Sequence, residues 1–216
     1  VSAHAGSCGT KFACGKFLIK ERSRSRFARP RERGVEEIIQ MGIEIHTIDQ
    51  SRGDDLKLKN QPFSVFGRMI VKFDGEHWSH SVEHFNKRTE MCFPDEDYSY
   101  DETARLGFAV GAYDGDECIA LAIMRDAMLN YMYLYDLKVN AAYRRQGVGK
   151  RLIEKAAELA KARGYRGIYT VGQDNNLAAC GFYLKSGFVI GGLDTLVYRS
   201  SLQENKRDIY FYLDAQ

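Results

Sequence analysis

The architecture of this chain follows from eight consecutive residues, Tyr143-Arg144-Arg145-Gln146-Gly147-Val148-Gly149-Lys150. They lie between an apolar run typical of a strand and a long pattern of helical spacing. Two glycines let the backbone approach a ligand closely, and the unpaired N–H groups at a helix start favour an anion. Arg144, Arg145 and Lys150 add positive charge at the same point. This order of strand, glycine loop and helix predicts a pyrophosphate-binding loop, and an ordinary glycine turn before a helix is the alternative.

The length and composition of the chain favour a single domain. Its 216 residues are 44% hydrophobic, which is enough to bury one sizeable core. It contains no unbroken apolar run of about 18 residues, so we expect no membrane span. The Arg-rich start lacks the apolar segment of a secretory signal peptide. The five cysteines form no Cys-x-x-Cys pair, which favours reduced thiols in a cytoplasmic protein over disulfides or a zinc site.

Residues 1–40 differ from the rest of the chain in charge and pattern. They hold nine Lys/Arg and four Glu, a net charge of +5 against +2 for the whole chain, so the remainder carries −3. They show no sustained period of 2 or 3.6, and we expect a disordered basic extension. A nucleic-acid or targeting arm and a solvated tail are alternatives. The extension is also compatible with a non-native origin, in which Val35-Glu36-Glu37 translates a ribosome-binding sequence. We favour this origin, with the natural start at Met41.

Residues 41–216 are expected to form one domain of alternating strands and helices. Asp-Gly turns at Asp74-Gly75 and at Asp114-Gly115-Asp116 indicate two hairpins. A helix follows the glycine loop and ends at Gly164, and a second helix is expected from Asn176 to Ser186. Hairpins followed by a strand–helix–strand–helix unit predict an α+β fold with a mixed sheet. The expected strands are 43–48, 63–73, 77–85, 106–113, 118–125, 131–140, 168–171, 188–197 and 209–213, with a short helix or irregular link at 49–58.

A second motif follows later in the chain and reads Gln173-Asp174-Asn175-Asn176-Leu177-Ala178-Ala179-Cys180-Gly181-Phe182-Tyr183, closing with Lys185-Ser186-Gly187-Phe188. The earlier spacing, Arg-x-x-Gly-x-Gly, is neither the dinucleotide pattern nor the nucleotide P-loop. Arg-x-x-Gly-x-Gly followed by Asn-x-x-Ala-x-x-x-Tyr and Gly-Phe resembles the GCN5-related N-acetyltransferase (GNAT) superfamily. The resemblance implies the acyl-CoA N-acyltransferase fold, a mixed, mostly antiparallel central sheet flanked by helices.

The resemblance implies acetyl-CoA as co-substrate. Asn176 is expected to hydrogen-bond the CoA arm, although a plain helix N-cap also explains it. The strand before the loop is expected to splay from its neighbour, so that Leu137 and Val139 pair with the pantetheine arm through main-chain atoms. Tyr183 is the expected general acid that protonates the departing thiolate, because a phenol with a pKa of about 10 is protonated at neutral pH. An ordinary helix tyrosine is the alternative. The loop residues expected to bind the co-substrate are Arg144, Arg145, Gln146, Gly147, Val148, Gly149 and Lys150.

Asp136 lies on the same strand and is a candidate for the substrate side. An amine arrives as an ammonium ion and must lose a proton before it attacks a thioester. Asp136 is therefore expected to anchor the ammonium or to relay its proton, directly or through water. A structural carboxylate that pairs with Lys138 or an arginine is the alternative.

Three further stretches resemble the streptothricin (nourseothricin) N-acetyltransferases, which confer antibiotic resistance on bacteria. The resemblance covers about residues 58–214 and none of residues 1–40. It implies direct acetyl transfer to a primary amine of the β-lysine moiety of streptothricin. Loss of that positive charge weakens the drug's binding to ribosomal RNA, where phosphate attraction dominates. The stretches are Gln61-Pro62-Phe63-Ser64-Val65-Phe66-Gly67-Arg68 with His77-Trp78, the motif from Gln173, and Gly191-Gly192-Leu193-Asp194-Thr195-Leu196-Val197-Tyr198 with Tyr210-Phe211-Tyr212-Leu213.

Acidic and aromatic residues are expected to receive this cationic small molecule. The acidic run from Asp95 to Glu102 is suited to steering it, and aromatic faces are suited to cation–π contact. A solvated loop is the alternative for the acidic run, and Asp194 is either a pocket carboxylate or a structural partner. The residues expected to bind the substrate are Trp78, Asp97, Tyr98, Asp101, Asp136 and Asp194.

Other functions stay open at this point. An enzyme of the same superfamily acting on an aminoglycoside, a polyamine or a protein amine is the main alternative. A regulatory module that binds acetyl-CoA without turnover is another, against which Asn176 and Tyr183 argue. We expect nucleic-acid binding, if any, from residues 1–40 and none from the catalytic domain. The histidines lack partners at ligand spacing, so no metal site is expected, and a homodimer is left open.

Overall fold

A computed structural model describes residues 42–127 and 129–215 of the chain. The expectations for residues 1–40, and for Met41 as the natural start, lie outside the described residues.

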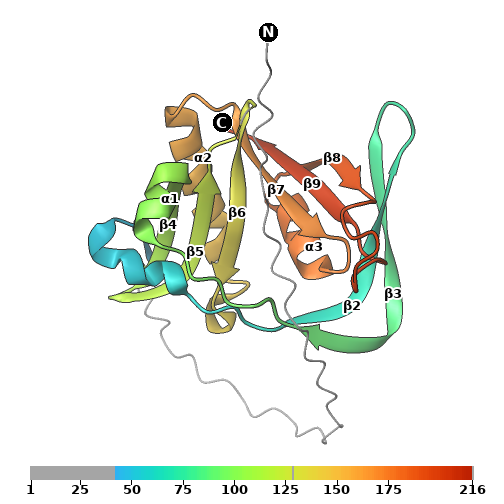
Figure 1. Ribbon diagram of the computed structural model, residues 1–216, viewed down its shortest axis with the longest axis horizontal. Coiled ribbons are helices and arrows are strands. Elements are labelled where there is room, and N and C mark those ends of the chain that lie inside the picture. The colour runs from blue at the N-terminus through green and yellow to red at the C-terminus, as the bar shows by residue number, and fades with distance from the viewer. Residues whose placement is uncertain (1–41, 128, 216) are drawn as a thin grey trace, which may run out of the picture.

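Within the described residues, seven strands form the central sheet in the order β1-β4-β5-β6-β7-β9-β8 (Figure 1). Every neighbouring pair is antiparallel except β6 and β7, which are parallel. A separate hairpin is made by β2 and β3. This is the mixed, mostly antiparallel α+β sheet that the sequence predicts. The strands are β1 (Glu44–Thr47), β2 (Phe63–Phe73), β3 (Trp78–Met91), β4 (Gly107–Asp114), β5 (Glu117–Arg125), β6 (Tyr131–Val139), β7 (Gly167–Gln173), β8 (Val189–Asp194) and β9 (Asp208–Asp214).

Both faces of the sheet are buried near β5, because its side chains alternate between two hydrophobic clusters. Ala122 and Met124 belong to the larger cluster, whereas Leu121 and Ile123 belong to the smaller one. Helices α2 and α3 lie over the face of the larger cluster, and η1 and α1 cover the other face at β4 and β5. The helical elements are η1 (Gln50–Lys57), α1 (Tyr100–Leu106), η2 (Ala141–Tyr143), α2 (Val148–Ala162) and α3 (Leu177–Lys185).

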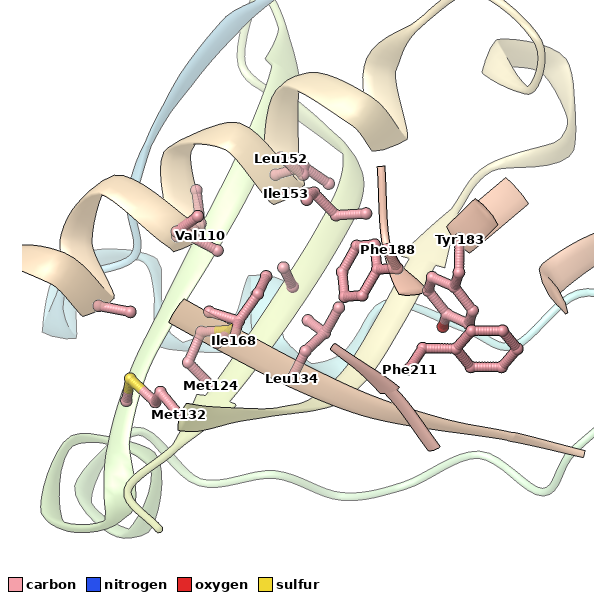
Figure 2. Packing of buried hydrophobic residues seen from close by; sticks show 14 of the residues in the cluster. Val110, Met124, Met132, Leu134, Leu152, Ile153, Ile168, Tyr183, Phe188 and Phe211 are labelled. Atoms are coloured by element: carbon pink, nitrogen blue, oxygen red, sulfur yellow. The ribbon is translucent and has the colours of Figure 1, made fainter. Parts of the chain in front are cut away.

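The larger cluster holds α2 and α3 to the sheet. Leu152 and Ile153 of α2 are fully buried against it, and Tyr183 of α3 packs on the rings of Phe188 and Phe211 (Figure 2). Burial of large apolar side chains is the main favourable term in folding, so these contacts determine where the two helices begin relative to the strands.

The strands β6 and β7 pair over only three residues and then separate. Tyr131, Met132 and Tyr133 lie opposite Gly167, Ile168 and Tyr169, after which the pairing ends. Figure 1 shows the two strands diverging from this point. On its other side, β6 stays paired with β5, but the register skips Tyr135 in a β-bulge. A bulge bends and twists its strand, and the splayed strand expected before the glycine loop is therefore present.

The structure differs from the expected elements in three places. Helix α1 was expected to be part of an acidic loop, yet Ser99 caps it by accepting a hydrogen bond from the Glu102 N–H (3.2 Å). Strand β3 continues to Met91 rather than ending at 85. Strand β8 ends at Asp194 instead of reaching 197, because the Asp194 carboxylate accepts hydrogen bonds from the N–H groups of Leu196 and Val197 and turns the chain.

We predict that Phe211→Ala lowers the free energy of unfolding by about 3–5 kcal/mol, because it leaves a cavity in the larger cluster. Denaturant titration followed by circular dichroism measures the change. Leu202→Ala is the control, since Leu202 is 95% exposed and its truncation should cost little. Equal losses in the two variants would contradict the assignment of Phe211 to the core.

Candidate active site

The glycine loop leaves the start of α2 without a side-chain cap. Gly147 is the N-cap residue and has a left-handed conformation with φ +83°. As a glycine it has no side chain that could accept a hydrogen bond from the first turn of the helix. The first helical hydrogen bond runs from the Arg151 N–H to the Gly147 carbonyl (3.1 Å). The N–H groups of Val148, Gly149 and Lys150 therefore precede it as unpaired helix donors. An uncapped helix start of this kind is suited to bind a phosphate group.

Two of the side chains expected to bind the co-substrate instead hold the loop in shape. Arg144 donates to the carbonyls of Val139 (3.0 Å) and Pro62 (3.2 Å). Gln146 donates to the Ala142 carbonyl (2.7 Å). These contacts tie the loop to the end of β6. They fix the main chain of the loop, and a direct contact of these side chains with the co-substrate stays a prediction.

The positive charge that faces solvent at the loop comes from Arg145 and Lys150. Both are exposed, and Lys150 lies 3.6 Å from Glu154 one turn along α2. Arg145 has φ +64°, an uncommon conformation for a residue with a side chain. Strained backbone of this kind often occurs at ligand sites.

Val148 and Gly149 serve packing. The Val148 side chain is buried in the larger cluster. A Cβ at Gly149 would lie 3.1 Å from the ring of Phe182 and 3.5 Å from Val139. At Gly149 the missing side chain lets α2 approach α3, and the close approach to a ligand that the loop glycines predict is not needed to explain it. Gly147 differs, because a Cβ there would meet nothing within 4 Å.

The main chain of Leu137 and Val139 faces the gap between β6 and β7. Along a strand, successive residues point their N–H and C=O groups to opposite edges. The Asn140 N–H donates to the Ile119 carbonyl on β5 (2.9 Å), so Val139 and then Leu137 point to the other edge. Thr170 of β7 donates across the start of the gap to the Leu134 carbonyl (2.9 Å). This edge is suited to pair with an extended amide-bearing ligand.

Asn176 and Tyr183 are the two residues of the second motif with expected roles. The Asn176 side-chain oxygen caps α3 by accepting from the Ala179 N–H (3.2 Å), as the simpler interpretation proposed. Tyr183 is buried beside the gap, and burial raises the pKa of its phenol to about 12. A hydrogen bond with Thr170 opposes that rise, and the charge of Asp136 adds to it. Tyr183 therefore stays protonated and lies within electrostatic reach of Asp136.

Asp136 belongs to a half-buried network on the opposite face of the sheet. The Tyr98 hydroxyl donates to its Oδ2 (3.1 Å), and the buried Lys138 ammonium lies 3.4 Å from the same atom. Lys138 also donates to Glu96 (2.6 Å). Burial raises the pKa of Asp136, and Lys138 opposes part of the rise. The carboxylate is thus a stronger base than an ordinary aspartate, and it also pairs with Lys138 as the structural interpretation proposed.

The residues expected to bind the substrate are not all brought together. Tyr98 and Asp136 touch, and Asp97 and Asp101 are exposed nearby on the segment that carries Tyr98 and on α1. Trp78 lies beside the turn of the β2–β3 hairpin and packs against Phe73 in a tilted arrangement (4.8 Å between ring centroids). The acidic segment begins past the other end of that hairpin, so Trp78 is separated from it.

Part of the acidic run has structural partners. Asp95 accepts from the Asn60 N–H (2.8 Å) and pairs with Lys59 (3.2 Å). Glu96 pairs with Lys138. These contacts hold the segment against residues 59–60 and against β6, and the steering role of the acidic run stays a prediction.

Thr170, which donates to the Leu134 carbonyl, was not singled out from the sequence, and Lys138 was named only as a pairing partner of Asp136. Alternate tyrosines at 131, 133 and 135 form a period-2 pattern that was available in the sequence. Within residues 42–127 and 129–215, no group of three metal-ligating side chains gathers, and no helix is long and apolar enough to cross a membrane.

Comparisons with known proteins agree with this geometry. The profile of the acetyltransferase (GNAT) family matches residues 76–188. Streptothricin acetyltransferase A of Bacillus subtilis (strain 168) is 35% identical over 159 residues, which cover 73% of this chain and 92% of that protein. A streptothricin acetyltransferase of Escherichia coli is 30% identical over 53% of this chain and 66% of its own length.

Two solved structures have a similar fold. One is a Bacillus anthracis (strain Ames) protein assigned as a streptothricin acetyltransferase, in complex with acetyl coenzyme A, with a TM-score of 0.69 and 30% identity over 82% of this chain and 99% of that one. The other is a nourseothricin acetyltransferase with a TM-score of 0.67, covering 81% of this chain and 99% of that one. Its identity of 19% supports the fold alone.

We predict that Gly147→Val weakens CoA binding by about tenfold, because a β-branched residue disfavours the left-handed conformation that aims the helix donors. Isothermal titration calorimetry measures the dissociation constant. Gly164→Val is the matched control: Gly164 has φ +90° just beyond the other end of α2, and its Cβ would also meet nothing within 4 Å. Equal effects of the two substitutions on CoA affinity would contradict a diphosphate site at the start of α2.

Proposed function

The chain belongs to the acetyltransferase (GNAT) family, and we propose from this premise that it acetylates a primary amine of streptothricin, in the β-lysine moiety. As a member of this family it is an acetyl-CoA-dependent N-acetyltransferase. The proposal depends mainly on the gap between β6 and β7. Tyr183 lies on one face of the sheet at this gap and Asp136 on the other face. The uncapped start of α2 follows the end of β6.

The residues present fit acetyl-CoA. The N–H groups at the start of α2 are suited to hold its diphosphate, with Arg145 and Lys150 adding charge. The edge of β6 at Leu137 and Val139 is suited to hold the pantetheine amides. Acetyl-CoA supplies the thioester carbon to which the amine nitrogen bonds as the C–S bond breaks. Asn176, whose side-chain oxygen caps α3, lies at the start of that helix just after β7.

In the proposed reaction Asp136 receives the proton of the acceptor ammonium. An alkylammonium is protonated at neutral pH and must become an amine before it attacks. A buried carboxylate with a raised pKa is a better proton acceptor than an exposed one. Lys138 and Tyr98 hold its oxygen in place, so that the carboxylate is oriented before the substrate arrives.

Tyr183 donates its proton to the departing thiolate. Its pKa of about 12 keeps the phenol protonated across the physiological range. Thr170 lies between Tyr183 and the Leu134 carbonyl, and its hydrogen bonds orient the phenol. Acid and base thus approach the reacting atoms from opposite faces of the sheet, through the gap.

The same geometry would serve another polycationic amine, such as an aminoglycoside or a polyamine. The relatives named as streptothricin acetyltransferases favour streptothricin. The test is release of CoA thiol from acetyl-CoA in the presence of streptothricin, an aminoglycoside or spermidine. The proposal predicts the highest kcat/KM with streptothricin, and thiol release only with another acceptor would contradict it.

We predict that Tyr183→Phe lowers kcat by about 10²-fold or more while the KM for acetyl-CoA stays within twofold, because only the proton donor is lost. The control is Tyr165→Phe, which removes a hydroxyl that donates to Asp126, directly after the end of β5. Unchanged turnover in Tyr183→Phe would remove this residue from the reaction.

We predict that the pH profile of kcat/KM has a rising limb that follows the ionisation of Asp136, because only the ionised carboxylate accepts a proton. This limb lies at a higher pH than for an ordinary aspartate, because burial raises the pKa of Asp136. Asp136→Asn should lose this limb and most of the activity. No loss from Tyr183 ionisation is expected up to about pH 10, because its pKa is about 12. Asp54→Asn, at an exposed carboxylate on η1, is the control. A limb retained in Asp136→Asn would exclude Asp136 as the base.

A further inference from the structure

Lys138 lies between two carboxylates on the sheet face opposite α2 and α3. Asp136 and Lys138 alternate along β6 after its bulge, so their side chains share one face. They lie opposite Ile123 and Leu121 of β5, which belong to the smaller hydrophobic cluster. The side chain of Lys138 is 5% exposed, that of Asp136 19% and that of Glu96 37%. The lysine is therefore the most deeply buried of the three groups, and Glu96 lies nearest to solvent.

The two carboxylates contact Lys138 at different distances. The ammonium donates to Glu96 Oε2 at 2.6 Å and to the Leu58 carbonyl at 3.1 Å. Its nitrogen lies 3.4 Å from Asp136 Oδ2. Hydrogen bonds between an ammonium and a carboxylate are typically about 2.7–2.9 Å long. Glu96 is therefore the close partner of Lys138, and Asp136 is the distant one.

Glu96 is held in this place by contacts that do not involve Asp136. The side-chain amide of Asn60 donates to Glu96 Oε2 (2.8 Å) and to the Pro94 carbonyl (2.7 Å). Asn60 lies on the link from η1 to β2, and Glu96 lies on the link from β3 to α1. Both links cross the end of β6 (Figure 1). The position of Glu96 beside Lys138 is therefore fixed from outside the central sheet.

The charges of the two carboxylates and the lysine do not cancel, because they sum to one negative charge when all three groups are ionised. The two tyrosines that face Asp136 do not change this sum. Tyr98 donates to it (3.1 Å), and Tyr183 of α3 lies within electrostatic reach. Burial raises the pKa of both phenols, so both are neutral at neutral pH. The guanidinium of Arg125, from β5, lies over the ring of the neighbouring Tyr135. An acceptor ammonium is suited to supply the missing positive charge.

Proton transfer to Asp136 changes what Lys138 needs. In the proposed reaction an N–H bond of the acceptor ammonium breaks, its electron pair stays on the nitrogen, and the proton forms an O–H bond on Asp136. Asp136 then has no charge. A buried ammonium that loses its carboxylate partner is strongly unfavourable. Because Glu96 lies at 2.6 Å, Lys138 keeps a carboxylate partner before and after the transfer.

We propose that Glu96 is a positioning residue, which binds Lys138 throughout the reaction and thereby leaves Asp136 free to change its charge. The inference rests on the proposed function, in which Asp136 takes the proton of the acceptor. Glu96 acts through Lys138 and not on the reacting atoms. Burial raises the pKa of Asp136, Lys138 opposes the rise, and the charge of Glu96 adds to it. Without that charge, Asp136 would become the main partner of Lys138 and a weaker base.

The test is Glu96→Gln, because glutamine keeps a hydrogen-bond acceptor for Lys138 and loses only the charge. We expect the pKa of Asp136 to fall, so that the rising limb of kcat/KM moves to lower pH. We expect kcat to fall on the order of tenfold, because the base is weaker. The KM for acetyl-CoA should stay within about twofold, since no contact to the co-substrate changes.

Two further variants separate this role from a structural one. The double variant Glu96→Gln/Lys138→Met also removes the ammonium, so its limb should return to a higher pH than in Glu96→Gln. Loss of packing alone would not move the limb in opposite directions. The matched control is Glu158→Gln, which breaks another lysine–glutamate pair (2.9 Å to Lys155) on the exposed side of α2 and should leave the limb in place.

A ¹³C NMR titration of the side-chain carboxyl groups separates this inference from the proposed function, because it needs no turnover. An Asp136 signal that titrates at lower pH in Glu96→Gln, and at higher pH again in the double variant, supports the inference even if no amine is acetylated. In that case only the proposed function fails. An Asp136 titration that is unchanged in Glu96→Gln, or that moves to higher pH, overturns the inference. So does a double variant that titrates as Glu96→Gln does.

The unsubstituted protein gives a test that does not depend on the folding of a variant. The inference requires the Glu96 carboxylate to stay ionised over the pH range in which Asp136 takes up its proton. The same titration follows both signals. Protonation of Glu96 before Asp136 would overturn the inference.

Discussion

The site depends on the early end of the pairing between β6 and β7. These two parallel strands share three residue pairs, and beyond Tyr133 and Tyr169 the edge of β6 has no neighbouring strand in the described structure. An unpaired strand edge in a protein interior is costly unless its polar groups find partners. Thr170 satisfies the Leu134 carbonyl and Arg144 satisfies that of Val139. The remaining polar groups of this edge are suited to pair with an extended ligand, and for this reason we propose the gap as the co-substrate site.

Charge around the gap is arranged differently on its two sides. The helix start at Gly147, with Arg145 and Lys150, favours an anion. Across the sheet, Asp136 lies on the face that also carries tyrosine rings. Lys138 is buried between Asp136 and Glu96, and removal of one partner of such a pair typically costs about 3–5 kcal/mol. The network therefore keeps the acidic segment against β6 and holds Asp136 in position. In the proposed reaction, the anionic donor and the cationic acceptor therefore approach from opposite sides and do not compete for the same charges.

The motifs around Gly147 and Tyr183 were sufficient to predict the fold, and the candidate site is built on the same two segments. They act through local geometry, such as a positive φ at Gly147 and a cap at Asn176, which a short sequence specifies. Helix α1 could also have been found, because Ser99 followed three residues later by Glu102 matches the sequence pattern of a capping box. The stacking of tyrosines from three strands was not predictable in the same way. Tyr133, Tyr169 and Tyr212 are brought together by the strand order β6-β7-β9, and non-local pairing of this kind is not written in any one segment.

The measurement that tests this account most directly is amide hydrogen exchange with and without acetyl-CoA. The account predicts slower exchange at the start of α2, in Val148, Gly149 and Lys150, and along the edge of β6 at Leu137 and Val139. Both segments should change together, because one molecule would contact them. Binding of acetyl-CoA that leaves exchange in both segments unchanged, or that slows it only elsewhere in the chain, would contradict the account.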